Sequence, residues 1–297
     1  MRVYIITSAK FEECYIEEWV KYHLNMGFDK IIINDNNPKD YPYNPKDILK
    51  KYIDDGTVII ERYYNDTNTV LEENQDADMC NIYTWLYNKY KNEFDWAAKL
   101  DIDEYLEIPE TNNDIKFFLQ QDKFSNVLSI LIPWKEYKVK DEYIYQYTRL
   151  KNNRDRYIMN PEFKFCNYTF KTICRKSNYI YMITNHSCLF NNNIDINNYI
   201  LYAYPDGFNT QNIKYEDFVE NNQKYLFDLT NICRINHYCV KSFEETANHM
   251  EKFKLYKIDE MWKKWRDGIY QLYPELFDNP RDLYKLYFID NINNIEN

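Results

Sequence analysis

The sequence predicts an α/β fold with a mixed, mostly parallel central sheet and a helical C-terminal tail. In the first hundred residues, short β-branched and aromatic runs alternate with segments of helical spacing. This β-α-β-α-β-α-β order is typical of parallel strands that are joined by right-handed crossovers. Beyond residue 125 the strand-like runs follow one another without long helices, which indicates antiparallel pairing. The last forty residues have a polar, helical pattern.

The elements of the first hundred residues follow from their apolar runs and end signals. Strands are expected at residues 3–7, 30–35, 57–63 and 96–102. Helices are expected between them, at residues 12–26, 44–55 and about 74–90. Gly27 and Gly56 stand where the C′ residues of the first two helices belong, and Asn44-Pro45 supplies an N-cap and an N1 proline.

The later part of the chain predicts one short helix, further strands and the tail. The helix is expected at residues 112–121, and the strands at 126–134, 168–175, 179–184 and 234–240. Ser242 to Glu245 has the pattern of a capping box, which predicts a helix through about residue 257. No linker rich in proline, glycine or serine divides the chain. We therefore expect one domain over residues 1–241 and a C-terminal helical extension over residues 242–297.

The composition excludes the common glycine-rich phosphate sites. The 297 residues include only 4 glycines, and no two of them lie close enough for a G-x-G-x-x-G turn or a P-loop. The net charge of −10 argues against a duplex nucleic acid as partner and against an anionic membrane surface. No run approaches the roughly 18 apolar residues of a transmembrane segment, so none is expected.

The cysteines predict a reducing environment. The 7 cysteines form an odd set without a C-x-x-C pair. Reduced thiols are the simplest interpretation, and a zinc knuckle is not expected. The N-terminal segment lacks the pattern of a signal peptide. These observations together predict a cytoplasmic location.

Three of the predicted strands end in polar residues that should meet at one edge of the sheet. The first strand ends at Thr7 to Lys10, the second at Asn34 to Asn36, and the fourth at Asp101 to Glu104. In open α/β sheets, ligands bind outside the carboxyl ends of the strands. This edge is therefore the predicted ligand site.

Asp101 and Asp103 are the sharpest signal at this edge. In an extended chain, residues i and i+2 share a face, with Cα atoms about 6–7 Å apart. Two carboxylates in that position can hold Mg²⁺ or Mn²⁺, which prefer oxygen ligands and often bind substrate phosphates as well. Such a cation would neutralise a diphosphate leaving group. The alternative is a solvated strand end with no ligand.

Other candidate residues each have two interpretations. Asp35 can accept a hydrogen bond from a base or ribose, or it can belong to a turn formed by residues 34–37. His237 can be a ligand or a satisfied histidine of its strand. Lys171 and Arg175 share one face of a strand pattern, where they can meet a phosphate or form an exposed basic edge.

Four segments resemble those of a known family, in the same order along the chain. They are EEWVKYHLNMGFD, IIINDNNP, KLDIDEYLEI and INHYCVKSFEE. They resemble the E-W-x-x-Y-H…G-F-D, I-Y-D-N-N-S, D-x-D-E-F-L and H-Y-x-x-K-S-x-E-E segments of family-92-like and related family-2-like glycosyltransferases. The resemblance spans about residues 1–250.

The resemblance implies a GT-A fold, the nucleotide-diphospho-sugar transferase sandwich. It implies a nucleotide-binding half over residues 1–110 and an acceptor-binding half over residues 111–241. It also implies a hexosyltransferase-type enzyme that moves a sugar from a UDP-linked donor to a hydroxyl acceptor such as a glycan, with Mn²⁺ or Mg²⁺.

Site residues carry over by position. Asp101, Asp103 and His237 become the expected metal ligands. The expected donor-binding residues are Asp35, Asp101 and Lys241, which match the family's segments, together with Thr7 and Lys10 at the end of the first strand and Lys171 on its strand face. The family's K-N-E after the first strand is Lys10-Phe11-Glu12 here, so the contact made by that asparagine is lost. The family's F-G turn is Glu136-Tyr137 here, without a glycine. The acceptor loop should therefore differ in shape, and the identity of the acceptor does not carry over from the family.

The resemblance favours an inverting transfer, in which Asp103 holds the cation and a carboxylate deprotonates the acceptor hydroxyl. Glu136 and Asp141 are the candidate bases. Two alternatives remain. One is an inactive, carbohydrate-binding protein with a GT-A shell. The other is an aspartate-based phosphohydrolase, although D-x-D would then normally follow the first strand and lead into G-[TS].

Overall fold

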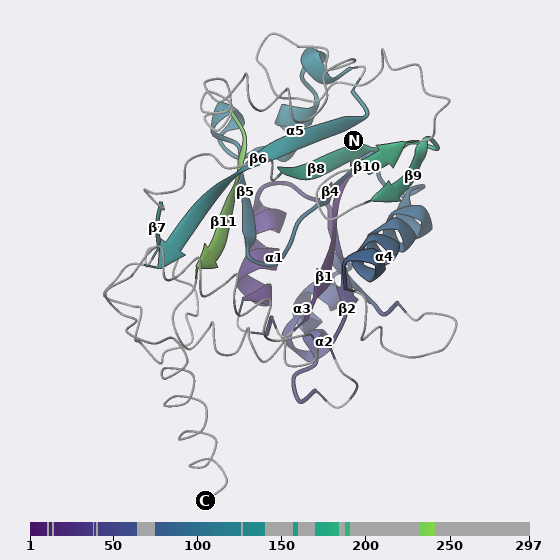
Figure 1. The fold of residues 1–297 in the computed structure, drawn as a ribbon, viewed down its shortest axis with the longest axis vertical. Helices are drawn as coiled ribbons and strands as arrows, with labels where there is room; N and C mark the ends of the chain where they lie inside the picture. Colours follow the sequence, from purple (N-terminus) through teal and green to yellow (C-terminus); the bar gives the residue numbers. More distant parts are fainter. Residues whose placement is uncertain are drawn as a thin grey trace, which may run out of the picture. The chain divides into compact units, whose positions relative to one another are not determined.

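The computed structural model describes the chain in segments (Figure 1). The described residues are 1–10, 12–13, 15–37, 39, 41–63, 75–125, 127–139, 157–159, 170–183, 188–190 and 232–240. The chain divides into two compact units, Met1–Asn248 and His249–Asn297, and all described residues belong to the first. The predicted boundary at residues 241 and 242 and the predicted C-terminal helix lie outside the described residues.

A nine-stranded sheet organises this unit, in the order β3-β2-β1-β4-β8-β6-β11-β5, with β7 paired to β6. Among the described strands, β3, β2, β1 and β4 are mutually parallel, and β6 and β11 run in the same direction as these four. The strands β8, β5 and β7 run the opposite way. The sheet is therefore mixed and mostly parallel, as the sequence predicts.

The strands have the following bounds: β1 Val3–Ala9, β2 Lys30–Asp35, β3 Val58–Glu61, β4 Trp96–Lys99, β5 Glu104–Glu107, β6 Ser129–Val139, β7 Tyr157–Met159, β8 Phe170–Arg175 and β11 Arg234–Val240. A separate hairpin consists of β9 Ile180–Ile183 and β10 Cys188–Phe190. The helices are α1 Ile16–Asn25, α2 Pro45–Ile48, α3 Lys50–Asp54, α4 Gln75–Tyr90 and α5 Ile115–Leu119. Two 3₁₀ turns cover Pro109–Thr111 and Asp122–Phe124.

Helices α1 and α4 lie on opposite sides of β1 (Figure 1), and each packs on its own hydrophobic cluster. The first contains Trp19 and Val20 of α1 together with Ile5 of β1. The second contains Tyr83 and Leu86 of α4, with Ile6 of β1 and residues of the β9–β10 hairpin. Successive residues of a strand point to opposite faces, so Ile5 and Ile6 serve different clusters. The parallel strands are buried on both sides, which explains their continuous apolar runs.

Helix α1 covers the outer edge of β5, the terminal strand of the sheet. Trp19 Nε1 donates to the carbonyl of Glu104 at 2.7 Å, and Tyr22 Oη donates to the carbonyl of Leu106 at 2.7 Å. The amide of Leu106 donates to His23 Nε2 at 3.3 Å, while His23 Nδ1 lies 2.9 Å from the carbonyl of Trp19, four residues earlier. Side chains of α1 thus satisfy backbone groups that an edge strand would otherwise expose. This is the structural role of the E-W-x-x-Y-H pattern.

The sequence misses β5 and misplaces several element ends. Strand β5 begins with Glu104, a charged residue that is completely buried here, so its pattern did not indicate a buried strand. The helix expected at 44–55 is two short helices, because Leu49 leaves helical geometry at φ −99° and ψ 12°. Helix α1 begins at Ile16 instead of residue 12. Gly27 and Gly56 do have the positive φ of C′ residues, 95° and 79°.

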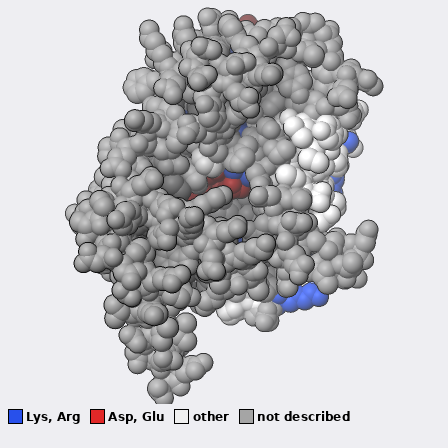
Figure 2. Space-filling view, in the orientation of Figure 1, with Lys and Arg blue, Asp and Glu red and all other residues white. Residues whose placement is uncertain are grey.

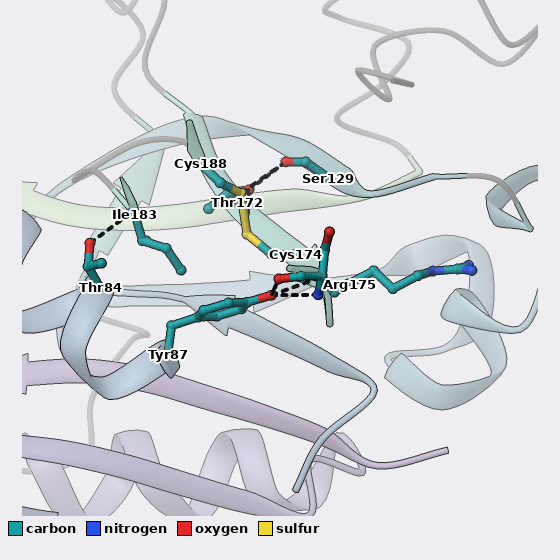
Figure 3. Close-up of a disulfide and its surroundings, with 9 residues drawn as sticks. Thr84, Tyr87, Ser129, Thr172, Cys174, Arg175, Ile183 and Cys188 are labelled. Atoms are coloured by element: carbon teal, nitrogen blue, oxygen red, sulfur yellow. Dashed lines mark hydrogen bonds between the residues drawn. A yellow bond between two sulfur atoms is a disulfide. The ribbon is translucent and has the colours of Figure 1, made fainter. Parts of the chain in front are cut away.

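A disulfide joins Cys174 of β8 to Cys188 of β10 (Figure 3). It connects the hairpin to the central sheet, and Ser129 Oγ and Thr172 Oγ1 lie within 3.5 Å of Cys188 Sγ. On the α4 side of the hairpin, Thr84 Oγ1 accepts from the amide of Ile183 at 2.9 Å. The expectation of reduced thiols is wrong for this pair, because the two cysteines meet only when the hairpin folds back. Cys80 and Cys233 are free thiols among the described cysteines.

No described helix has the length and apolar character needed to cross a membrane.

Candidate functional site

The ends of β2, β1 and β4 lie side by side, as the sequence predicts. Strand β1 pairs in parallel with β2 on one side and with β4 on the other. The register places Ala9 level with Asp35, and the amide of Asn36 donates to the carbonyl of Ala9 at 2.9 Å. The residues that follow β4 begin at this same edge. The predicted convergence of polar strand ends is therefore present.

A tight turn from Asp101 to Glu104 joins β4 to β5. The amide of Glu104 donates to the carbonyl of Asp101 at 3.1 Å. The side chain of Glu104 reaches back and accepts from the amide of Asp101 at 2.9 Å. From the neighbouring strand β11, the amide of Tyr238 donates to the carbonyl of Asp103 at 3.0 Å. Hydrogen bonds between its first and last residues thus close the turn, and a third attaches it to β11. Asp103 lies at the tip of the turn.

Two buried lysines hold the carboxylate of Asp101. Lys99 Nζ lies 2.7 Å from Oδ1, and Lys171 Nζ forms an ion pair with Oδ2. Both lysine side chains are only 1% exposed. Tyr83 of α4 also donates to Asp101 Oδ1 at 3.2 Å, and Lys99 Nζ stands 4.5 Å above the Tyr83 ring. The Asp101 carboxylate is therefore the counter-ion of two ammonium groups.

Burial and charge act against each other in the pKa values of this cluster. Burial raises the pKa of Asp101, but the ammonium groups of Lys171 and Lys99 outweigh it and hold that pKa well below its ordinary value. Burial lowers the pKa of Lys99 to about 8 despite the opposing carboxylate of Asp101. Burial lowers the pKa of Lys171 as well, but the carboxylates of Asp101 and Glu104 outweigh it, so that pKa lies above its ordinary value. Asp101 is therefore ionised throughout the physiological range.

Glu104 is the second carboxylate that Lys171 reaches. Its Oε1 lies 3.1 Å from Lys171 Nζ, and its side chain is completely buried. Burial raises the pKa of Glu104 to about 7, against the opposing effect of Lys171. Lys171 of β8 consequently binds the first and the last residue of the Asp101–Glu104 turn. The expectation that Lys171 lies on an exposed basic edge is wrong.

Asp103 faces His237 of β11. Asp103 Oδ2 lies 3.8 Å from His237 Nε2, and both side chains are partly exposed. The imidazole packs against Trp134 of β6, with ring centroids 4.1 Å apart. In the sheet, His237 is level with Glu104 of β5 on one side and with Glu136 of β6 on the other. The structure therefore brings together two of the three predicted metal ligands, Asp103 and His237.

The pair Asp103 and His237 fits a divalent cation of the expected kind. Ligand atoms about 2.1 Å from a six-coordinate cation lie about 3 Å apart when adjacent and about 4 Å apart when opposite. The observed separation of 3.8 Å lies between these two values and is nearer to that of opposite ligands. No cluster of three or more candidate ligands occurs among the described residues, so substrate and water would complete the shell. Asp101 faces two ammonium groups instead, and its role as a metal ligand stays a prediction.

A pocket of about 270 Å³ opens beyond the ends of β2 and β3. Its lining combines the carboxylate of Asp35 with Arg62 and the aromatic pair Tyr41 and Tyr43. Asp35 Oδ1 accepts from both nitrogens of Asn37, at 3.0 Å and 2.8 Å, and Asp35 Oδ2 lies 3.3 Å from Arg62 Nη1. Both earlier interpretations of Asp35 therefore have a structural counterpart, since it belongs to a turn and it lines a pocket.

Beside this pocket, Asn34 joins β2 to β1 and to a residue that follows β3. It is buried at the end of β2, and its Nδ2 donates to Ser8 Oγ of β1 at 3.2 Å. Its Oδ1 accepts from the amide of Tyr63 after β3 at 2.7 Å. The sequence placed Asn34 at a strand end and in a possible turn over residues 34–37, but it did not predict these contacts with β1 and Tyr63.

The remaining predicted residues lie in different settings. Thr7 is completely buried in β1, and its hydroxyl has no hydrogen-bond partner among the described residues. Lys10 is half-buried just after β1. Glu136 lies in β6, but its side chain is not among those described, and Asp141 and Lys241 lie outside the described residues. The donor-binding and catalytic roles of these residues stay predictions.

Sequence reasoning missed Lys99, Glu104, Tyr83 and Trp134. One signal was available, because Lys99 ends a buried strand of otherwise apolar residues, WAAK, two positions before Asp101. A lysine in such a strand needs a buried counter-ion. Tyr83 and Trp134 carried no comparable signal, because aromatic residues at such positions are most often core. On the face drawn in Figure 2, acidic and basic side chains of described residues lie next to each other near the centre.

Comparisons with known proteins are consistent with these features. A family model described as glycosyltransferase family 92 matches residues 7–266. A search of curated proteins found no significant match.

Three solved structures are similar to the chain at low identity. Residues 1–349 of S. aureus TarS match at 14% identity and a TM-score of 0.33, over 59% of this chain and 47% of that one. The galactosyltransferase LgtC, solved with donor and acceptor sugar analogues, matches at 12% identity and a TM-score of 0.34, over 80% and 87%. The bifunctional glycosyltransferase WbbM matches at 10% identity and a TM-score of 0.36, over 88% and 51%. The chain spans about half of the TarS and WbbM chains, and TM-scores this low carry no argument about function.

Proposed function

The chain belongs to glycosyltransferase family 92, and we propose that it moves a sugar from a UDP-linked donor to a hydroxyl acceptor with the help of Mn²⁺ or Mg²⁺. Membership confirms the predicted family, and the mixed sheet agrees with the predicted GT-A class. A glycosyl transfer requires a sugar donor and an acceptor. The nucleotide, the cation and the stereochemistry are our proposal.

The observation that carries the proposal is the pair Asp103 and His237 at the carboxyl edge of the sheet. Their 3.8 Å separation suits a shared cation, and the edge is where α/β sheets bind ligands. A carboxylate suits both Mg²⁺ and Mn²⁺, whereas an imidazole ligand favours Mn²⁺ of the two. When bound, the cation supplies a Lewis acid that neutralises charge on the departing diphosphate.

The pocket beside Asp35 supports a nucleoside at the other end of the donor. Strand β1 separates β2 from β4, so the ends of β2 and β4 lie about 10 Å apart, which is two strand spacings. A nucleoside diphosphate is long enough to bridge this distance. Asp35 and Arg62 offer a hydrogen-bond acceptor and donors, and Tyr41 and Tyr43 offer ring faces for a base.

Deprotonation of the acceptor is assigned to Glu136 in an inverting reaction. Its position in β6 is level with His237 in β11, which supports Glu136 in preference to more distant carboxylates. A base on the side of the sugar opposite the diphosphate would take the proton of the acceptor hydroxyl as that oxygen attacks. Asp141 remains the alternative base within the same proposal.

The test is nucleotide release from a panel of nucleotide sugars in Mn²⁺, together with thermal shift. We expect UDP release with one UDP-sugar, abolished by chelation of the cation. Asp103→Asn should reduce turnover at least about a hundredfold, because it removes a charged cation ligand. The matched control is Asp54→Asn, which removes an exposed carboxylate on the surface of α3 whose ion pair, among the described residues, is with Lys50.

Three other outcomes would contradict the proposal in distinct ways. A thermal shift that Asp103→Asn leaves intact would remove Asp103 from the donor site. Binding of nucleotide sugars without turnover would favour an inactive, carbohydrate-binding protein. Phosphate release from simple monoesters would favour a phosphohydrolase.

A further inference from the structure

We propose that Lys171 is a positioning residue of the transferase site, which holds Asp103 in place by binding both ends of the turn that carries it. This inference rests on the proposed function of Asp103. Lys171 acts through Asp101 and Glu104, and it does not touch the donor. It therefore replaces the expectation that Lys171 contacts phosphate.

The geometry of Lys171 carries the first step. Its Nζ pairs with Asp101 Oδ2 and lies 3.1 Å from Glu104 Oε1, so one ammonium group binds residues 1 and 4 of a four-residue turn. Lys171 belongs to β8, which is 70 residues away from Asp101 in sequence. Since its side chain is 1% exposed and lies between two carboxylates, a phosphate in solvent has no access to it.

The comparison with Lys99 carries the second step. Lys99 is equally buried and lies 2.7 Å from the other oxygen of Asp101. Its ion pair is with Asp101 alone among the described residues, and it comes from β4, the strand that leads into the turn. Both lysines neutralise Asp101, but Lys171 also links it to Glu104. A comparison of the two lysines therefore separates the effect of neutralising Asp101 from the effect of linking the two ends of the turn.

The contact with Trp134 carries the third step. Lys171 Nζ lies 5.3 Å from the centroid of the Trp134 ring, within the range of a cation–π contact. This indole also packs against His237, with ring centroids 4.1 Å apart. Lys171 therefore contacts the groups that position both proposed cation ligands. It holds the turn that carries Asp103, and it contacts Trp134, which packs against His237.

The experiment compares Lys171→Met with Lys99→Met, since methionine approximates the length of lysine without its charge. Each variant leaves Asp101 with one ammonium group, so we expect both to lower the melting temperature. Hydrogen exchange at the amide of Tyr238, which donates to the carbonyl of Asp103, reports on the turn without any ligand. We expect that amide to exchange at least tenfold faster in Lys171→Met and to change less than threefold in Lys99→Met.

Mn²⁺ binding gives the second readout, and it is measured from the electron paramagnetic resonance signal of the free ion. We expect the dissociation constant to rise at least tenfold in Lys171→Met and less than threefold in Lys99→Met. Equal changes in the two variants, in exchange and in Mn²⁺ affinity, would overturn the proposal, because charge balance alone would then explain Lys171.

A double variant keeps the test decisive if Lys171→Met folds poorly. Lys171→Met with Glu104→Gln removes the carboxylate left without its cation, which should restore the melting temperature. The proposal expects Mn²⁺ affinity and Tyr238 protection to stay low in this variant, and their return to wild-type values would refute it. A wild-type protein that binds neither Mn²⁺ nor nucleotide sugar would refute the proposed function, while the exchange of Tyr238 would still test Lys171.

Discussion

Asp101 and Asp103 are two residues apart and have different environments because of two lysines. Asp101 forms ion pairs with the buried lysines Lys99 and Lys171, while its own side chain is 36% exposed. Asp103 lies 3.8 Å from an imidazole at the tip of the turn. A D-x-D pattern therefore need not mean two equivalent metal ligands. In this protein one aspartate anchors the turn, and the other is our proposed cation ligand.

Replacement of Asn34 should show how strongly the ends of the strands depend on one side chain. Asn34→Ala removes the acceptor of the Tyr63 amide and the donor to Ser8 Oγ. Because these groups are partly or fully buried, we expect a loss of about 1–3 kcal/mol in the free energy of unfolding, measured with urea.

The control for this prediction is Asn88→Ala on the exposed face of α4. Asn88 accepts from Lys91 at 3.3 Å at the surface, and its loss should change stability by less than about 0.5 kcal/mol. Equal effects of the two substitutions would contradict the role assigned to Asn34.

At the scale of elements, the sequence predicts those that local pattern specifies. The ranges 30–35 and 234–240 match β2 and β11 at both ends, and the helix expected at 74–90 matches α4 to within one residue. β5 was missed because Glu104 is buried by pairing with Lys171, which a local window cannot detect. The hairpin partner β10 was missed because it has only three residues.

The contact between α1 and β5 gives a prediction about an edge strand. Trp19→Phe keeps an aromatic ring but leaves the carbonyl of Glu104 without the donor that lies at 2.7 Å. We expect a loss of about 1–3 kcal/mol from the unsatisfied carbonyl, plus the cost of a smaller ring. Chemical denaturation measures it. Trp85→Phe is the control, because Trp85 is only partly buried on α4, and a larger loss there would contradict the prediction.

The disulfide between β8 and β10 gives a second prediction at this scale. Cys174 and Cys188 are 14 residues apart, and closing a loop of about 15 residues stabilises a protein by about 3 kcal/mol. Cys174→Ser with Cys188→Ser should lower stability by about 2–4 kcal/mol under oxidising conditions. Peptide mapping by mass spectrometry would identify the bond.

Reduction supplies the matched control for the disulfide. A thiol reductant should lower the melting temperature of the wild-type protein toward that of the double variant and leave the variant unchanged. A wild-type protein that is insensitive to reductant would contradict this prediction.

At the scale of the whole molecule, the sheet divides the proposed site into two ends. The parallel strands β3 and β2 border the pocket of Asp35 and Arg62. The strands β6, β11 and β5 carry or adjoin His237 and Asp103. Strand β4 leads from one half into the Asp101–Glu104 turn, and β8 supplies Lys171. A donor that spans both halves would be bound in one half through its nucleoside and in the other half through its diphosphate.

This division predicts that substitutions at the two ends will weaken the binding of different parts of a nucleotide. Arg62→Ala should weaken both UMP and Mn²⁺–UDP about tenfold, or about 1.4 kcal/mol, because it acts at the nucleoside end. Asp103→Asn should weaken the binding of Mn²⁺–UDP at least tenfold and change the affinity for UMP less than about twofold. Titration calorimetry measures all four constants. Equal losses for the two ligands in Asp103→Asn would show that the ends are not separate.

The sequence by itself determined the α/β class, most of the strands and the edge of the sheet at which the polar residues meet. These features depend on local periodicity and on the general rule that parallel strands present their carboxyl ends together. Only the tertiary structure decided that Asp101 pairs with Lys171, 70 residues away, that α1 covers the edge of β5, and that β10 is bound to β8 by a disulfide. The reason is that a buried charge or an edge strand needs a partner, while its own sequence does not specify which distant residue will supply it.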